Sequence, residues 1–151
     1  MISDVAKKHW EKFSQYKTFE DLEKILNISW AIGPGEIELL IPSIQIRAEG
    51  PALVGIFYLT KTLLVEVNDA TRGNSFDFIG RFKLQNLRIN LSEQSIKNAA
   101  GEAISYQIAE VIIRHSGNAG STFSYAGNDR DGWIALVKEA FPINLLEWQK
   151  P

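Results

Sequence analysis

The sequence predicts an α+β fold, in which a seven-stranded antiparallel barrel or sandwich follows two helices and is capped by a C-terminal helix. Residues 36–91 contain successive runs in which apolar and polar residues alternate, as they do in half-buried strands. Residues 104–126 contain two more strand-like runs, with a turn-forming stretch between them. The period then becomes helical, because apolar side chains recur every four residues at Trp133, Val137 and Phe141.

Two short helices are expected before the first strand. Ser3 can cap the first helix, and Thr18 can cap the second, with Asp21 in the capping-box position. Each helix has one apolar stripe, and the two stripes consist of Val5, Ala6, Trp10 and Phe13, then Phe19, Leu22, Ile25 and Leu26. We interpret residues 1–27 as a helical extension that covers the sheet, with self-association as the alternative.

The first three strands are expected at residues 36–41, 53–60 and 62–68. The turn-forming residues Gly33–Gly35 precede the first strand, and Pro42 ends it or places it at a sheet edge. The second strand is apolar throughout, which predicts burial on both faces, and a tight turn at Lys61 connects it to the third. A polar loop then runs from residue 68 to residue 74.

The remaining strands are expected at residues 76–84, 86–91, 104–114 and 121–126. In the first of these, the alternation places on one face Phe76, Phe78, Phe82 and Leu84. Residues 92–109 are rich in Ala and Ser and fit either a helical stripe or a strand. We expect a loop or a short helical piece near residues 93–101 and a strand from about Ile104, although a longer helix also fits. The turn residues 116–120 join the last two strands into a hairpin.

The last helix is expected at residues 130–141. Asp129 or Asp131 would cap it and oppose its dipole, and Pro142 would stop it. The tail, residues 142–151, is strongly apolar, so we expect it to dock on the domain or on a partner chain.

Composition sets the class of protein. With 151 residues and 45% hydrophobic residues, the chain is expected to form a single domain, residues 1–151, with a real core. The net charge of −2 gives no basic field for nucleic acid or for an anionic membrane. The absence of cysteine excludes disulfides and thiolate chemistry, and the charged N-terminus lacks a signal core, so we expect a cytoplasmic protein.

The sequence contains no convincing catalytic, cofactor or metal site. The histidines His9 and His115 lie far apart and have no further metal ligands at suitable spacing. Residues 117–121 lack the lysine of a phosphate-binding loop, and Ser121 lacks the flanking glycines of a nucleophile elbow. We therefore expect no catalytic residue, no cofactor and no metal.

Two local motifs resemble the pleckstrin-homology-like barrel, including its bacterial and GRAM-type relatives. Residues 55–60 (GIFYLT) with the alternating run 63–67 (LLVEV) are similar to that family's glycine-aromatic hairpin. Residues 131–137 (DGWIALV) are similar to its closing helix, whose tryptophan plugs one end of the barrel. The resemblance covers residues 30–141 and implies the fold.

The best-known ligand of this family is a phosphoinositide head group, which clustered Lys and Arg side chains hold. Around the first hairpin this chain has Arg47 and then no basic residue until Lys61, and the neighbouring carboxylates would repel phosphate: Glu36, Glu38 and Glu49. The resemblance therefore implies the fold, whereas phosphoinositide or membrane binding is disfavoured.

The leading functional hypothesis is a non-catalytic binding module that takes a protein partner or a second copy of itself. One alternative is a small ligand-binding or enzyme-like domain, with a pocket in a curved sheet that holds a small molecule. Another is an immunity- or inhibitor-type protein whose acidic residues face one basic partner. The residues predicted to line a pocket or interface are Tyr58, Phe78, Tyr106, Tyr125 and Trp148.

Overall fold

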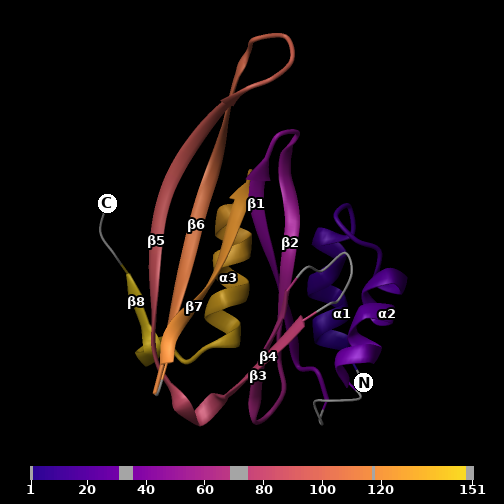
Figure 1. Ribbon diagram of the computed structural model, residues 1–151, viewed down its shortest axis with the longest axis vertical. Helices are drawn as coiled ribbons and strands as arrows, with labels where there is room; N and C mark the ends of the chain where they lie inside the picture. Colours follow the sequence, from indigo (N-terminus) through magenta and orange to yellow (C-terminus); the bar gives the residue numbers. More distant parts are fainter. Residues whose placement is uncertain (1, 31–35, 69–74, 117, 149–151) are drawn as a thin grey trace. The chain divides into compact units, whose positions relative to one another are not determined.

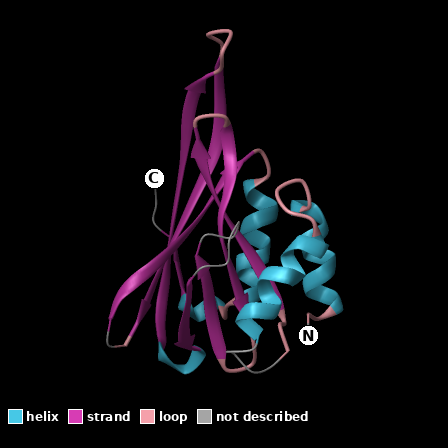
Figure 2. Ribbon diagram, turned by 45° about the vertical axis from the view of Figure 1, so that its right-hand side comes forward, coloured by secondary structure: helices cyan, strands magenta, loops and turns pink. Residues whose placement is uncertain are grey.

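The structure is a computed structural model that describes residues 2–30, 36–68, 75–116 and 118–148. It confirms the α+β class, with helices at both ends of seven antiparallel strands (Figure 1 and Figure 2). The chain forms two compact units, which consist of Met1–Ser43 with Leu53–Leu84, and of Ile44–Ala52 with Gln85–Pro151. The predicted turn at residues 33–35, the loop at 69–74 and the turn residue Gly117 lie outside the described residues.

The N-terminal helices begin where the sequence predicts. Ser3 caps α1 (Asp4–Trp10), since its Oγ accepts the Ala6 N–H at 3.1 Å. A 3-10 turn, η1 (Glu11–Phe13), follows. Thr18 caps α2 (Phe19–Trp30), since its Oγ1 accepts the Asp21 N–H at 3.2 Å. The predicted stripes are buried at Ala6, Trp10, Phe13, Leu22, Ile25 and Leu26.

The predicted stripe was wrong at Val5, whose side chain is 50% exposed. Val5 precedes the buried Ala6 by one residue, and neighbours one residue apart do not share a helix face. Phe19 is only half-buried.

The first sheet has the strand order β1-β2-β3-β4, formed by β1 (Leu39–Arg47), β2 (Gly50–Leu59), β3 (Leu63–Asn68) and β4 (Ser75–Gly80). Residues 55–59 of β2 are buried on both faces, as predicted, whereas Leu53 and Val54 are half-buried. Thr60 fixes the turn at Lys61, because its Oγ1 accepts the Leu63 N–H at 3.0 Å.

The predicted end of the first strand at Pro42 was wrong. Strand β1 starts three residues later than predicted and continues through Pro42 to Arg47. Because β1 is the outermost strand of its sheet, proline can sit within it without removing a ladder hydrogen bond, so the predicted edge position is confirmed.

The predicted strand 76–84 was wrong in its second half and in its inward face. Strand β4 ends at Gly80, and Arg81–Lys83 form a 3-10 turn, η2. Among the described side chains of β4, Ile79 is buried, whereas Phe78 is 39% exposed; Phe82, in η2, is 85% exposed, and the side chain of Phe76 lies outside the described part. The turn breaks the alternation of period two, so Phe82 no longer shares a face with Phe78.

The second sheet has the order β7-β6-β5-β8, formed by β5 (Leu84–Lys97), β6 (Ala103–His115), β7 (Asn118–Gly127) and β8 (Leu146–Trp148). The predicted loop or short helix at residues 93–101 was wrong for residues 93–97, because β5 extends to Lys97, whereas residues 98–101 form a tight turn. The apolar tail docks on the domain: after η3 (Ile143–Leu145), β8 pairs parallel to β5 at Leu87–Ile89.

Helix α3 (Arg130–Ala140) packs on β6 and β7 (Figure 1). Asp129 caps it, because its Oδ1 accepts the Gly132 N–H at 3.2 Å. Trp133 is fully buried, with its ring 5.6 Å from that of Phe123 and 5.8 Å from that of Tyr125. The predicted closing helix and the burial of its tryptophan are therefore confirmed.

Candidate functional site

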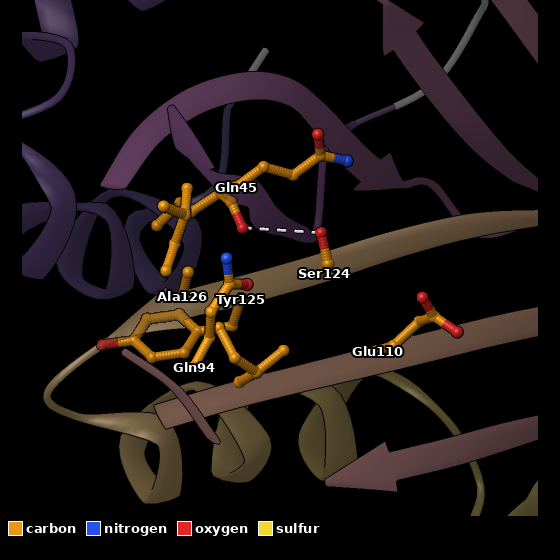
Figure 3. A pocket seen from close by; sticks show the side chains of 9 residues that line it. Gln45, Gln94, Glu110, Ser124, Tyr125 and Ala126 are labelled. Carbon is orange, nitrogen blue, oxygen red and sulfur yellow. Dashed lines mark hydrogen bonds between the residues drawn. The ribbon is translucent and has the colours of Figure 1, made fainter. Parts of the chain in front are cut away.

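A pocket of about 260 Å³ lies within the second unit, between the end of β1 and the sheet β5-β6-β7 (Figure 3). Its lining comes from Ile44, Gln45 and Ile46 of β1, Gln94 of β5, Ile108 and Glu110 of β6, and Ser124, Tyr125 and Ala126 of β7. It is therefore built by segments far apart in the chain, such as Ser124 and Ile44, which are 80 residues apart and in contact.

Strand alternation brings the β6 and β7 residues of the pocket together. Glu110 pairs with Ser124, and Ile108 pairs with Ala126, in the antiparallel register of the two strands. These four side chains share one face of the sheet, because residues two apart in a strand point the same way. The intervening residue Tyr125 is fixed on the other side, where its ring contacts Trp133 of α3.

The hydroxyl of Tyr125 holds the side chain in the same orientation, since it accepts a hydrogen bond from the Asp129 N–H at 2.8 Å just before α3 begins. Tyr125 thus links the pocket to the buried aromatic cluster under α3. On the β7 side of the pocket, Tyr125 is thus held by both a ring contact and a hydrogen bond.

The opposite wall of the pocket is the last part of β1. Ser124 Oγ donates a hydrogen bond to the Ile44 carbonyl at 3.4 Å (Figure 3). Strands β1 and β7 are each the outermost strand of their sheet. This side-chain contact therefore bridges two strand edges and places Gln45 beside the pocket.

The chemistry of the pocket is that of one carboxylate among neutral groups. Glu110 is half-buried. Besides Tyr125, the other polar side-chain groups are the amides of Gln45 and Gln94 and the hydroxyl of Ser124. The remaining walls are aliphatic. The lining contains no Lys, Arg or His. Ser124 has no neighbouring histidine in the lining to activate it, so the arrangement suits binding rather than nucleophilic catalysis.

The residues predicted to line a pocket or interface are distributed over both units. Tyr58 is buried in β2 and Phe78 lies exposed on β4, both in the first unit. Tyr106 is half-buried on β6, and Trp148 belongs to β8, although its side chain lies outside the described part. Tyr125 lines the pocket described above, and the role of the other four stays a prediction.

Sequence reasoning missed most of the pocket residues. Gln94 fell in the segment expected to be a loop, and Ile44–Ile46 fell beyond the expected end of the first strand. The alternation of apolar and polar residues from Ser43 to Arg47 could have extended that strand past Pro42. Nothing in the sequence indicated that β1 and β7 lie side by side.

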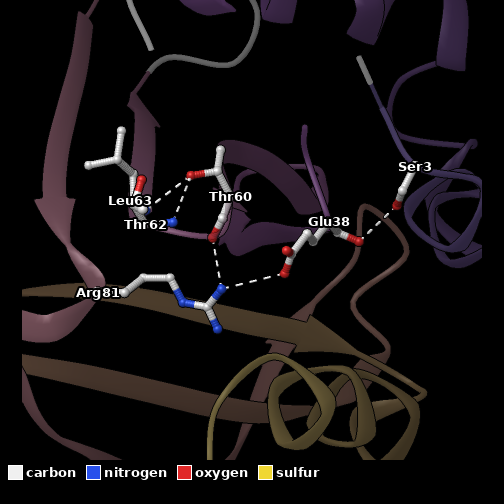
Figure 4. A network of polar contacts seen from close by, with 6 residues as sticks. All are labelled: Ser3, Glu38, Thr60, Thr62, Leu63 and Arg81. Atoms are coloured by element: carbon white, nitrogen blue, oxygen red, sulfur yellow. Dashed lines mark hydrogen bonds and ion pairs between the residues drawn. The ribbon is translucent and has the colours of Figure 1, made fainter. Parts of the chain in front are cut away.

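A second polar cluster lies in the first unit and has a structural role (Figure 4). Arg81 Nη1 donates to the Thr60 carbonyl at 2.7 Å and lies 3.5 Å from Glu38 Oε2. The Glu38 carbonyl in turn accepts the Ser3 hydroxyl at 2.9 Å. These contacts tie η2, the end of β2 and the start of α1 together.

A hollow of about 230 Å³ beside the N-terminal helices also carries structural contacts. Trp10, which contributes to its lining, donates its Nε1–H to the Lys17 carbonyl at 3.0 Å. Lys7 Nζ lies 5.3 Å from the centre of the Phe19 ring. Because its aromatic and basic groups contact each other, this hollow is a weaker candidate than the pocket beside Glu110.

The described part of the chain contains neither a helix long enough to span a membrane nor a cluster of metal ligands. None of its helices has the length and apolar character needed to cross a lipid bilayer. Within the same residues, no three side chains of His, Asp or Glu gather closely enough to hold a metal ion.

Comparison with known proteins gives no family for this chain: neither a protein-family model, nor a curated protein, nor a solved structure matches it. The pocket must therefore be interpreted from its own geometry and chemistry.

Proposed function

We propose that this chain is a non-catalytic binding module of pleckstrin-homology-like type, and that the pocket beside Glu110 receives a basic side chain of a protein partner. The order of elements supports the first part, since seven antiparallel strands in two sheets precede a helix with a buried tryptophan. The fold by itself supports no particular ligand, so the second part depends on the pocket.

The observation that carries the proposal is the charge of the pocket. Glu110 is the one charged residue of the lining, and its carboxylate forms no ion pair with another described residue. A half-buried carboxylate attracts a cation more strongly than an exposed one, because water screens the charge less. The aliphatic walls can hold the methylene stem of a Lys or Arg side chain while its charged end reaches Glu110.

The size of the pocket agrees with a single side chain. Its volume of about 260 Å³ is below the roughly 300–1,000 Å³ of pockets that enclose whole drug-sized ligands. The amides of Gln45 and Gln94 can accept further N–H groups of a guanidinium. An anionic phosphate would meet a carboxylate without any basic residue in the lining, which speaks against a phosphoinositide at this place.

A second candidate function uses the same pocket for a free small amine. The enclosed volume favours this reading as well, since a small cation could occupy the site without a protein attached. The two candidates differ in the size of the bound molecule, so one titration series can separate them.

The proposal is tested by following backbone amide NMR signals while capped arginine, capped lysine and a short arginine-containing peptide are added. We expect the largest shifts at the pocket residues of β6 and β7, and tighter binding of the peptide than of the single residues. Glu110→Gln should weaken binding about fivefold, because a partly exposed ion pair contributes ~1 kcal/mol.

Glu102→Gln is the matched control, because it removes an exposed carboxylate from the start of the same hairpin strand without touching the pocket. Equal binding by wild type and Glu110→Gln would contradict the proposal, and so would shifts confined to another surface. Binding of a free amine as tight as that of the peptide would favour the small-molecule carrier.

A further inference from the structure

The hairpin of β5 and β6 extends beyond its neighbours in the second sheet. Strand β7 pairs with β6 from Gln107 onward, and β8 pairs with β5 at Leu87–Ile89. Within this sheet, residues 93–97 and 103–106 therefore pair only with each other's strand. Figure 1 shows β5 and β6 running well past the end of β7.

The end of this arm is well ordered by hydrogen bonds. Asn98 Oδ1 accepts the Ala100 N–H at 2.9 Å and the Glu102 N–H at 3.0 Å, and the Asn98 N–H donates to the Glu102 carbonyl at 2.9 Å. Gly101 adopts φ +80°, a left-handed conformation that glycine takes without strain. A two-stranded ribbon is only marginally stable alone in water, so such an arm gains stability from an additional strand.

The outer edge of β5 offers backbone groups for such a strand. Since Asn98 directs its N–H toward Glu102, a regular antiparallel ladder directs the backbone groups of Lys97, Ser95 and Glu93 away from β6. These three residues are exposed, and β8 ends opposite Ile89, short of them. An edge of this kind can pair with another extended chain.

The charges on this edge are complementary to those on the same edge of a second copy. If a second copy lies antiparallel with Ser95 opposite Ser95, then Glu93 of each copy lies opposite Lys97 of the other. In this register, the backbone hydrogen bonds between the copies form at Glu93, Ser95 and Lys97, whose backbone groups point outward. The same pairing forms two ion pairs between the copies. Neither Glu93 nor Lys97 forms an ion pair in the described part of the structure.

The outermost strands of the two sheets lack such a pair of opposite charges: β1 has Arg47 as its one charged residue and β8 has Glu147. Strand β4 has Asp77 as its one charged residue, and β7 has no charged residue. On the hairpin of β5 and β6, Ile104 of β6 is 36% exposed, whereas Ile96 of β5 is half-buried.

We propose that two copies of this chain associate through the outer edges of β5, antiparallel about Ser95, to form a continuous sheet. This surface is distinct from the pocket beside Glu110, although Gln94 of the same strand belongs to that pocket. Opposite charges four residues apart could instead serve only to keep an exposed edge soluble. That reading predicts a monomer, and the experiment separates the two.

The test is sedimentation velocity of the full chain over a wide concentration range. We expect a concentration-dependent dimer for wild type. Glu93→Lys and Lys97→Glu should each weaken it about 30-fold, because two attractive pairs become two repulsive ones. The double variant, which exchanges the two charges, should restore wild-type association. Glu102→Lys, a charge reversal at the far side of the same turn, should leave association unchanged.

A second measurement tests the register directly. The chain has no cysteine, so Ser95→Cys introduces a single thiol. Antiparallel pairing would bring the two Cα atoms to about 5.5 Å, within the range of a disulfide, and mild oxidation should yield a covalent dimer. Ser105→Cys on β6 is the control and should react far more slowly.

A wild-type monomer at the highest concentration would overturn the proposal. A dimer that ignores both charge reversals, or that the charge exchange does not restore, would overturn it as well. Equal crosslinking at positions 95 and 105 would show that the β5 edges do not pair in this register.

Discussion

Replacement of Trp133 by alanine should strongly destabilise the protein, because the indole is fully buried under α3. Truncation of a buried tryptophan to alanine costs ~3–5 kcal/mol, through lost burial and the cavity that remains. Part of this loss comes from two ring contacts, at 5.6 Å to Phe123 and 5.8 Å to Tyr125, each worth about 0.5–1.5 kcal/mol. For a chain of this length, the melting temperature should fall by roughly 10 °C.

The assay is urea unfolding followed by circular dichroism, with thermal melting as a second measure. Trp133→Phe should lose only about 1–2 kcal/mol, since the smaller ring keeps part of the packing. Phe82→Ala is the matched control: it also removes an aromatic ring, but one that is 85% exposed, and should change stability by less than ~0.5 kcal/mol. If Trp133→Ala costs less than ~1 kcal/mol, or Phe82→Ala costs as much as Trp133→Ala, the assignment of α3 as the covering element is wrong.

Two further substitutions test local contacts by thermal melting. Asp129→Ala removes the cap bond to the Gly132 N–H and should lower the free energy of unfolding by ~1 kcal/mol. Asp131→Ala removes no cap bond and should lower it clearly less. Equal losses of stability in the two variants would contradict the capping role. Arg81→Met removes the 2.7 Å hydrogen bond to the Thr60 carbonyl and should lower the free energy of unfolding by ~1–2 kcal/mol. Arg81→Lys should recover part of this loss. An unchanged melting temperature for Arg81→Met would show that this hydrogen bond contributes nothing to stability.

Elements specified by local chemistry were predictable from the sequence. The helix starts at Ser3, Thr18 and Asp129 follow from side chains that satisfy N–H groups two or three residues away. Helix α3 followed from apolar residues recurring every four positions, and the hairpin of β6 and β7 followed from alternation around a short turn. In each case, the information lies within a few residues of the element that it specifies.

The candidate site was predictable only in part, since Tyr125 was identified as a pocket residue and Glu110, Gln94 and the end of β1 were not. Residues 93–97 carry small and polar side chains with weak strand preference, and they become a strand because β6 supplies backbone partners across the turn.

The sequence by itself determined where the helices begin, which side chains of α3 face the core, and that no basic cluster surrounds the first hairpin. The tertiary structure decided how far β1 and β5 extend, that β8 pairs parallel to β5, and which distant residues share a pocket. The physical reason is that helix caps and periodic burial depend on near neighbours, whereas strand length and pocket lining depend on hydrogen-bond and packing partners far along the chain.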